Sequence, residues 1–320
     1  MNKKIIAAAV AATMTSVAFA DVSITGLMKA NYKNTDLGNG TTIGNNISTE
    51  ANLYITGKSG DTTVYFELDA DSSDGVTSDN FDIEDQWMST KIGDITAKVG
   101  TWNGGDTILD ADSTRTIGKY ELKTSVGGLD LTFDGNGGNA DTNLKLATKV
   151  GDVAVSAKMK NAAEQYTLNT SVAGVDISYA LDAEDAANSD ESSLVVGTTV
   201  GGVRVEYAQA EADTGATIDG DSWFGDAAAL YVNSTTAGLA AGDDISGIKF
   251  KSDVAGNTVQ AVFFSVDDAT SGQNDVDNTK LVVTRPLAGG TTLEVIYLST
   301  DASASANDYE MIDVELAVKF

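Results

Sequence analysis

The chain contains no cysteine and no histidine, and it has a single proline, Pro286, among 320 residues. Without the first two residue types it has no disulfides, no thiolate or imidazole catalysis, and none of the usual zinc or haem ligands. Proline cannot donate a hydrogen bond to a sheet ladder, whereas the 32 glycines suit tight turns. This balance favours a chain built almost wholly of β-hairpins.

Long apolar runs are also missing, because no stretch after residue 20 approaches the roughly 18 residues of a membrane-spanning helix. The first twenty residues have the order of a secretory signal: Lys3 and Lys4, then an apolar stretch from Ile5, then the small-x-small site Ala18-Phe19-Ala20. We expect residues 1–20 to be removed and the mature chain to cover 21–320. A spanning helix is the alternative, but the run is short and interrupted by Thr and Ser.

The charge has one dominant sign, with 47 acidic residues against 20 basic ones and a net charge of −27. Loss of the two lysines of the leader takes it to about −29. Nucleic acid is therefore excluded as a partner. Anionic lipid headgroups are repelled as well, unless divalent cations bridge them.

From Asp21 onward, runs of about ten residues alternate apolar and polar side chains, which is the period of a half-buried strand. Tight Gly/Asp/Asn turns such as Ser59-Gly60-Asp61 and Gly151-Asp152 alternate with longer acidic loops. Val22–Lys33, eight hairpins and a last strand, Tyr309–Phe320, give about eighteen strands. The stretch Asp213–Asp244 is one long loop with a short element at Trp223–Val232. The pattern predicts an all-β chain.

Alternation alone fits both a soluble sandwich and a transmembrane antiparallel barrel with a wet lumen. The leader, the one-sided loop lengths and the scarcity of proline favour the barrel, as only helices and closed barrels satisfy the backbone in hydrocarbon. The last strand adds to this, since Leu316, Val318 and Phe320 share its apolar face. That ending resembles the C-terminal assembly signal of outer-membrane barrels. We expect 16–18 strands with short periplasmic turns and long extracellular loops.

The layout resembles the Gram-negative general porins over nearly the whole mature length. The resemblance implies sixteen strands, a homotrimer, contact with outer-membrane lipid and lipopolysaccharide, and insertion by the outer-membrane assembly machinery. It also implies that the loop after the fifth strand narrows the pore. The segment Lys98-Val99-Gly100 precedes the matching loop, residues 103–118, which is shorter than is usual in that family.

Pore selectivity depends on the width of the pore and the charges that line it. In general porins an acidic inward loop faces basic groups of the wall, and the resemblance implies the same here. The candidate loop residues are Asp106, Asp110, Asp112 and Arg115, and the candidate wall residues are Lys29, Lys91, Lys98, Lys119 and Lys123. The alternative is that these aspartates are simply solvated and that these lysines only keep the lumen wet.

The sequence thus predicts an outer-membrane porin for ions and small hydrophilic solutes, mildly cation-preferring, with no enzymatic activity and no cofactor. Two other hypotheses remain: a substrate-specific channel, which needs an aromatic or basic ladder, and a secreted or surface β-rich adhesin, which needs a fixed repeat. Ser–His hydrolysis lacks its histidine, and no acidic pair stands out for a glycosidase. The acidic stretches Asp69–Asp85, Asp182–Glu191 and Asp267–Asp277 are solvated loops or weak Ca²⁺ or Mg²⁺ sites.

Overall fold

The computed structural model describes residues 21–37, 41–73, 76–77, 82–102, 116–136, 142–160, 163–184, 190–212, 244–267, 275–302 and 308–320. These residues form nineteen strands of one antiparallel sheet and a single turn of 3₁₀ helix, η1 (Ala288–Gly290). The strands are β1 (Asp21–Leu37), β2 (Thr41–Ser59), β3 (Thr62–Ser73), β4 (Val76–Thr77), β5 (Asp82–Ile92), β6 (Ile95–Trp102), β7 (Thr116–Val126), β8 (Leu129–Asn136), β9 (Thr142–Val150), β10 (Val153–Met159), β11 (Ala163–Val172), β12 (Val175–Glu184), β13 (Glu191–Val200), β14 (Val203–Ala212), β15 (Asp244–Val254), β16 (Asn257–Asp267), β17 (Val276–Pro286), β18 (Thr291–Ala302) and β19 (Tyr309–Lys319).

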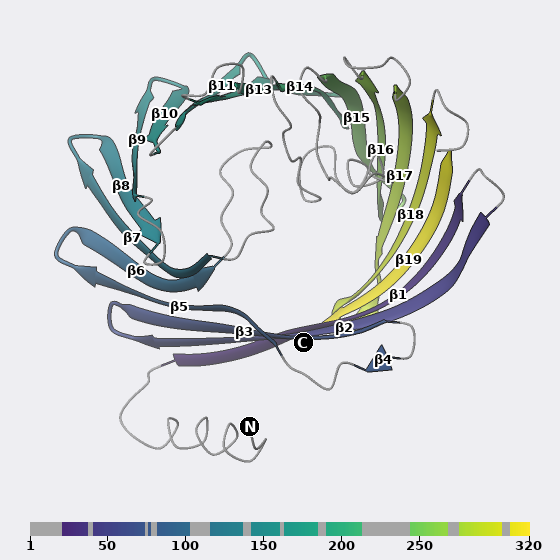
Figure 1. Cartoon of the computed structure of the whole chain (residues 1–320), viewed down its shortest axis with the longest axis horizontal. Helices are drawn as coiled ribbons and strands as arrows, with labels where there is room; N and C mark the ends of the chain where they lie inside the picture. The colour runs from purple at the N-terminus through teal and green to yellow at the C-terminus, as the bar shows by residue number, and fades with distance from the viewer. Residues whose placement is uncertain are drawn as a thin grey trace.

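The sheet closes on itself, because β1 pairs with β2 on one side and with β19 on the other. Among the described strands, the two-residue β4 pairs only with β3, and the ladder continues from β3 to β5. The remaining eighteen strands form a closed barrel in chain order, drawn as a ring in Figure 1. The predicted barrel is confirmed. The count agrees with the strands read from the residues and departs from the sixteen implied by general porins.

Tight turns join the strands at one end of the barrel, which we call the short-turn end. In the β7–β8 hairpin both turn residues, Gly127 and Gly128, have positive φ values of 61° and 85°. A two-residue turn of this kind matches the right-handed twist of the flanking strands. At the opposite, long-loop end, the connections range from residues 38–40 to residues 213–243. Asp21 and Phe320 both lie at the short-turn end.

The outward face of the barrel is apolar and exposed. Among its exposed large side chains are Val99, Leu122, Phe133, Leu168, Val283 and Leu316. An apolar surface that runs around a whole barrel far exceeds the patches that soluble monomers expose. Such a surface is the one expected to meet lipid in a transmembrane barrel. Within the described ranges, no helix is long and apolar enough to cross a membrane.

Outward tyrosines mark where this apolar face ends toward the long loops. The hydroxyl of Tyr207 donates to Gln209 at 3.2 Å, and that of Tyr166 donates to Glu164. Each partner lies two residues nearer to the long-loop end than its tyrosine. Amphipathic aromatic rings of this kind gather at membrane–water interfaces. The position of the tyrosines therefore fits a boundary between hydrocarbon and polar headgroups.

The most buried side chains of the described chain lie on the inward face, near the long-loop end of β14 to β19. Ile245, Val262 and Leu298 are at most 2% exposed, and each alternates with outward neighbours along its strand. The inward residues of β5 to β9 are instead mostly half-buried or exposed. Inward side chains are thus buried on the β14–β19 side of the barrel and largely accessible on the β5–β9 side.

Candidate functional site: the lysine-bearing wall of the lumen

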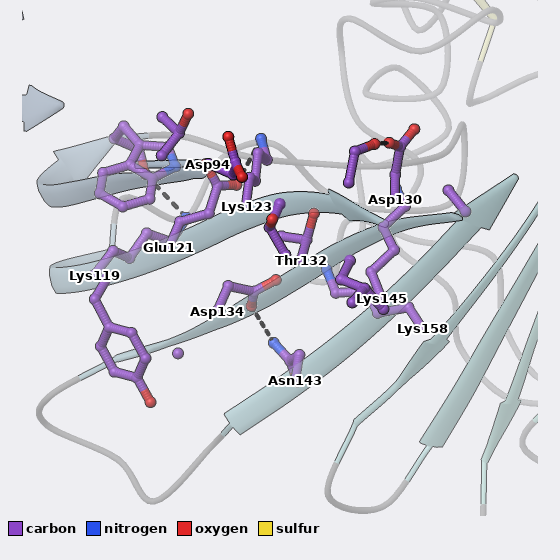
Figure 2. A pocket seen from close by; sticks show the side chains of 18 of the residues that line it. Asp94, Lys119, Glu121, Lys123, Asp130, Thr132, Asp134, Asn143, Lys145 and Lys158 are labelled. Carbon is purple, nitrogen blue, oxygen red and sulfur yellow. Dashed lines mark hydrogen bonds and ion pairs between the residues drawn. The ribbon is translucent and has the colours of Figure 1, made fainter. Parts of the chain in front are cut away.

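A cavity of about 750 Å³ lies against the inward face of β5 to β10. Figure 2 shows its side chains rising from neighbouring strands into one space. Its lining carries the five lysines Lys91, Lys119, Lys123, Lys145 and Lys158 and the four carboxylates Asp94, Glu121, Asp130 and Asp134. The number of lysines nearly equals the number of carboxylates, so this wall is strongly polar with only a small excess of positive charge.

The lysines follow the register of the strands. Lys91 lies opposite Thr96, Thr96 opposite Lys123, Lys123 opposite Thr132, Thr132 opposite Lys145, and Lys145 opposite Lys158. Residues paired in this way share one face of the sheet. A single lysine–threonine row therefore crosses six adjacent strands on the inner wall. We call Lys91, Lys123, Lys145 and Lys158 the lysine row.

A second, more acidic row lies one step closer to the long-loop end. Lys98 pairs with Glu121, Glu121 with Asp134, and Asp134 with Asn143. The carboxylate of Glu121 lies 2.9 Å from Lys123 Nζ, and Asn143 donates to Asp134 at 2.6 Å. The carboxylates thus lie beside the lysines (Figure 2). Their negative charge offsets much of the positive charge of the lysines.

An aromatic cluster borders this wall where β6 ends. The ring of Trp87 stacks on Tyr65, with centroids 5.2 Å apart. The ammonium of Lys98 lies 4.5 Å from the Trp87 ring and 4.1 Å from the Trp102 ring. Lys119 also lies over Trp102 and donates to its carbonyl oxygen at 3.0 Å. Cation–π contacts of this kind hold the two lysines in defined positions on the wall.

The predicted wall residues fall into two groups. Lys91, Lys98, Lys119 and Lys123 lie together on the neighbouring strands β5, β6 and β7. Lys29 lies apart on β1, where its ammonium is 3.1 Å from the carboxylate of Glu50. The structure therefore brings four of the five predicted lysines to one wall and leaves Lys29 in an ion pair elsewhere.

The predicted acidic loop is not part of the described chain. Asp106, Asp110, Asp112 and Arg115 lie outside the described residues, as does most of the segment 103–118 and all of the leader 1–20. The candidate element Trp223–Val232 also lies outside them. Among the residues that the structure describes, no group of three or more acidic side chains is arranged to hold a metal ion.

The predicted set of wall residues did not include Lys145, Lys158 or the aromatic cluster. Lys145 and Lys158 carry the same alternation signal as Lys91 and Lys123, but only the register shows that they extend the same row. Tyr65, Trp87 and Trp102 are separated by 22 and 15 positions and look scattered along the chain. Pairing of β3, β5 and β6 brings them together.

Of three comparisons with known proteins, only the comparison with solved structures finds matches, and these agree with the barrel architecture. No protein-family model matches the sequence, and a comparison with curated protein sequences finds no significant match. Solved structures match over nearly the whole length. OccK3 (OpdO) of Pseudomonas aeruginosa is 12% identical and covers 94% of this chain and 96% of its own, with a TM-score of 0.68.

Two further structures give the same result. OccK5 (OpdH) of Pseudomonas aeruginosa is 10% identical, covers 95% of this chain and 99% of its own, and has a TM-score of 0.67. A BenF-like porin from Pseudomonas fluorescens Pf-5 is 12% identical, covers 95% of this chain and 100% of its own, and has a TM-score of 0.69. At these identities the likeness shows the fold alone, which is a closed antiparallel β-barrel of eighteen strands.

Proposed function

We propose that the chain is an outer-membrane porin, a water-filled channel for passive diffusion of ions and small hydrophilic solutes. One observation carries this proposal: apolar side chains face outward, while the inward wall of β5 to β10 carries charged ones. An apolar exterior suits lipid, and a charged interior suits water. The predicted leader, homotrimer, lipopolysaccharide contacts and assembly by the outer-membrane machinery belong to the same proposal.

Several features support a channel over the other functions considered. The barrel has eighteen strands, and lumen width increases with strand number, so there is room for an aqueous path. The chain has no histidine for a Ser–His hydrolase, and the barrel neighbours include a named porin. A closed barrel with an apolar outer surface gives no support to the adhesin hypothesis.

The net charge of −27 favours a modest preference for cations, because acidic mouths raise the local cation concentration. The lysine row acts in the opposite direction at close range. Planar-bilayer recording in a salt gradient tests the proposal. We expect a stable, open conductance with a reversal potential on the cation side. Absence of any conductance from correctly folded protein contradicts the channel, and an anion-side potential contradicts the cation preference.

A second candidate is a channel specific for small anionic solutes. The lysine row and the adjacent Lys98–Trp102 contacts favour it, since a basic ladder is the feature such a channel needs. The two functions differ in concentration dependence. A general pore gives solute flux that rises linearly with concentration, whereas a specific one saturates and is blocked by its own solute. If the channel is specific, replacing all four members of the lysine row by glutamine should abolish the saturation of solute flux. If it is a general pore, the flux is linear with concentration before and after the replacement.

A further inference from the structure

The outward face of the barrel ends at the short turns in aliphatic side chains. Each of these is the last residue of its strand before a tight turn, and each is 55% to 70% exposed. We call the following six residues the aliphatic ring: Ile92, Val126, Val150, Val172, Val200 and Val254. Apolar side chains exposed to this extent are unfavourable in water, so the ring favours contact with hydrocarbon.

The aliphatic ring occupies the level at which outer-membrane barrels usually carry a second aromatic girdle. Among the described residues within two positions of a short turn or of the C-terminus, Phe320 is the one outward aromatic side chain. Tyr166 and Tyr207 lie further from the turns, toward the long-loop end. Tyrosine prefers the membrane–water interface because its ring is apolar and its tip is polar, whereas an aliphatic side chain has no polar tip. The composition of the ring therefore indicates hydrocarbon rather than the interface.

Hydroxyl groups on the same outward rim donate hydrogen bonds to the turns beside them. In three places the hydroxyl of one strand reaches a glycine carbonyl oxygen in the turn of the neighbouring hairpin: Thr148 to Gly128 at 2.9 Å, Thr198 to Gly174 at 2.9 Å, and Ser252 to Gly202 at 3.3 Å. At a turn in water, solvent can satisfy both groups. In hydrocarbon, polar groups must be satisfied within the protein. The repeated bond therefore suits turns that border hydrocarbon.

Charged side chains next to the short turns face the lumen rather than the outer rim. Asp130, Lys149 and Arg204 each lie one position from a strand end at a turn, and each pairs with inward residues. Among the described strand residues within four positions of a short turn, Arg285 is the outward exception. A long cationic side chain can lay its stem on apolar surface and extend its charged head to lipid headgroups. The outer rim is thus compatible with hydrocarbon along its whole described length.

The height of the apolar face requires the ring to be used. On β13 the outward apolar side chains run from Val200 up to Leu194, and the next outward residue is Ser192. With a rise of about 3.3 Å per residue and a tilt of about 40°, this stretch is about 15 Å high, against about 25 Å for the apolar belt of such barrels. Without Val200 the stretch would be only about 10 Å high by the same geometry. A hydrocarbon layer therefore has to reach the turns.

We propose that the aliphatic ring lies within the hydrocarbon of the inner phospholipid leaflet, so that the short turns themselves meet the headgroups. The inference deepens the proposed porin function and rests on its lipid-facing exterior. It places the short-turn mouth of the lumen at the membrane surface, with no collar of protein below it in the described chain. Solutes then leave the lumen at headgroup level, past the inward charges of Asp130, Lys149 and Arg204.

Spin labelling tests the depth of the aliphatic ring, since the chain has no cysteine of its own. Nitroxides are attached at Val200→Cys and Val150→Cys, with the lumen-facing neighbours Thr199→Cys and Lys149→Cys as matched controls and Val196→Cys as the reference within the apolar face. In vesicles of dilauroyl phosphatidylcholine, each label's collisions are measured with oxygen, which concentrates in hydrocarbon, and with a polar nickel chelate, which stays in water. We expect both ring labels to favour oxygen, as Val196→Cys does, and both neighbours to favour the nickel chelate.

The reference label separates this inference from the proposed function. Ring labels that favour the nickel chelate while Val196→Cys favours oxygen overturn the inference and leave the porin proposal standing. If Val196→Cys also favours the nickel chelate, the exterior does not face lipid, and the proposed function fails together with the inference.

The hydroxyl of Thr198 provides a second measurement at the same rim. Thr198→Ser keeps the donor to the Gly174 carbonyl oxygen, and Thr198→Ala removes it. We expect the unfolding equilibrium constant in the same vesicles to be at least about threefold larger for Thr198→Ala than for Thr198→Ser, because a carbonyl in hydrocarbon finds no water to replace the donor. The matched pair Thr199→Ser and Thr199→Ala, on the lumen side, should unfold alike. Equal constants for the two Thr198 variants would mean that water reaches the turn, and this result overturns the inference.

Discussion

The ring of Phe320 covers the bare backbone of Gly26. The two residues pair as neighbours across the closing seam of the barrel, with Gly26 N donating to Phe320 O at 2.8 Å and Phe320 N donating to Gly26 O at 3.0 Å. A Cβ at position 26 would overlap the phenyl ring. Placing an aromatic ring over a strand glycine compensates for the side chain that the glycine lacks. The last residue of the chain is thus part of the β1–β19 seam.

Gly26→Val should destabilise this seam by about 1–3 kcal/mol, because the added methyl groups displace the ring of Phe320. The free energy of unfolding of the barrel, measured in detergent with urea, provides the check. Ala30→Val is the control, since residue 30 lies on the same outward face of β1. Equal stability of the Gly26→Val and Ala30→Val variants would show that the position of the Phe320 ring does not require glycine at residue 26.

Deleting Phe320 should lower the folded yield more than Gly26→Val does. The deletion removes both backbone hydrogen bonds to Gly26 and the last apolar side chain of the face shared with Leu316 and Val318. The heat-modifiable fraction on a gel, in cells and after refolding of purified protein, measures the effect. A loss in cells without a loss in refolding points to the predicted assembly signal. An unchanged yield in both contradicts the prediction.

Arginine on the outward face should be costly, and arginine on the inward face should be tolerated. Val155→Arg or Leu146→Arg should cost roughly 2–4 kcal/mol if the site lies at the membrane midplane, because a charge is then placed in hydrocarbon. Ala147→Arg is the matched control, since Ala147 faces the lumen opposite Ser156. Unfolding free energies in lipid bilayers give the comparison. Equal penalties on both faces would contradict a lipid-facing exterior.

The aspartates of the segment 103–118 should control selectivity if that loop narrows the pore. Replacing Asp106, Asp110 and Asp112 together by Asn should shift the reversal potential toward anions. The effect should weaken at 1 M salt, where the Debye length is about 3 Å. Glu211, Asp244 and Asp267 form an outward acidic row at the long-loop end and supply the control when neutralised together. If the two triple variants behave alike, the loop is not the constriction.

Residues 1–20 should be absent from the protein found in the outer membrane. The mass of the intact purified protein should match a chain that starts at Asp21, because signal peptidase cleaves after small-x-small sites such as Ala18-Phe19-Ala20. A mass that includes Lys3 and Lys4 would contradict this. Changing Ala18 and Ala20 to bulky residues should cause the precursor to accumulate.

The sequence alone predicted the strands and the face on which each residue lies, but not every contact between strands. The alternation in Asn143–Val150 and in Val153–Met159 predicted both the strands and the side of each residue, since the period of a strand leaves only two faces. The strand count also followed from turns such as Gly127-Gly128, which leave little choice of register. The aromatic cluster did not follow, as Tyr65, Trp87 and Trp102 meet only through the pairing of three different strands.

Local chemistry in the sequence determined the strands, the turns and the distinction between outward and inward side chains, because each depends on neighbours within a few positions. Only the tertiary structure decided which strands lie across the lumen from one another. Lys91 and Lys158 became members of one row through the register of six strands, and Ile245 and Leu298 became buried although they face the inside of the barrel. The physical reason is that strand pairing around the closed barrel brings together residues that are far apart in the sequence. The pattern of neighbouring residues along the chain does not specify which of these distant residues will meet.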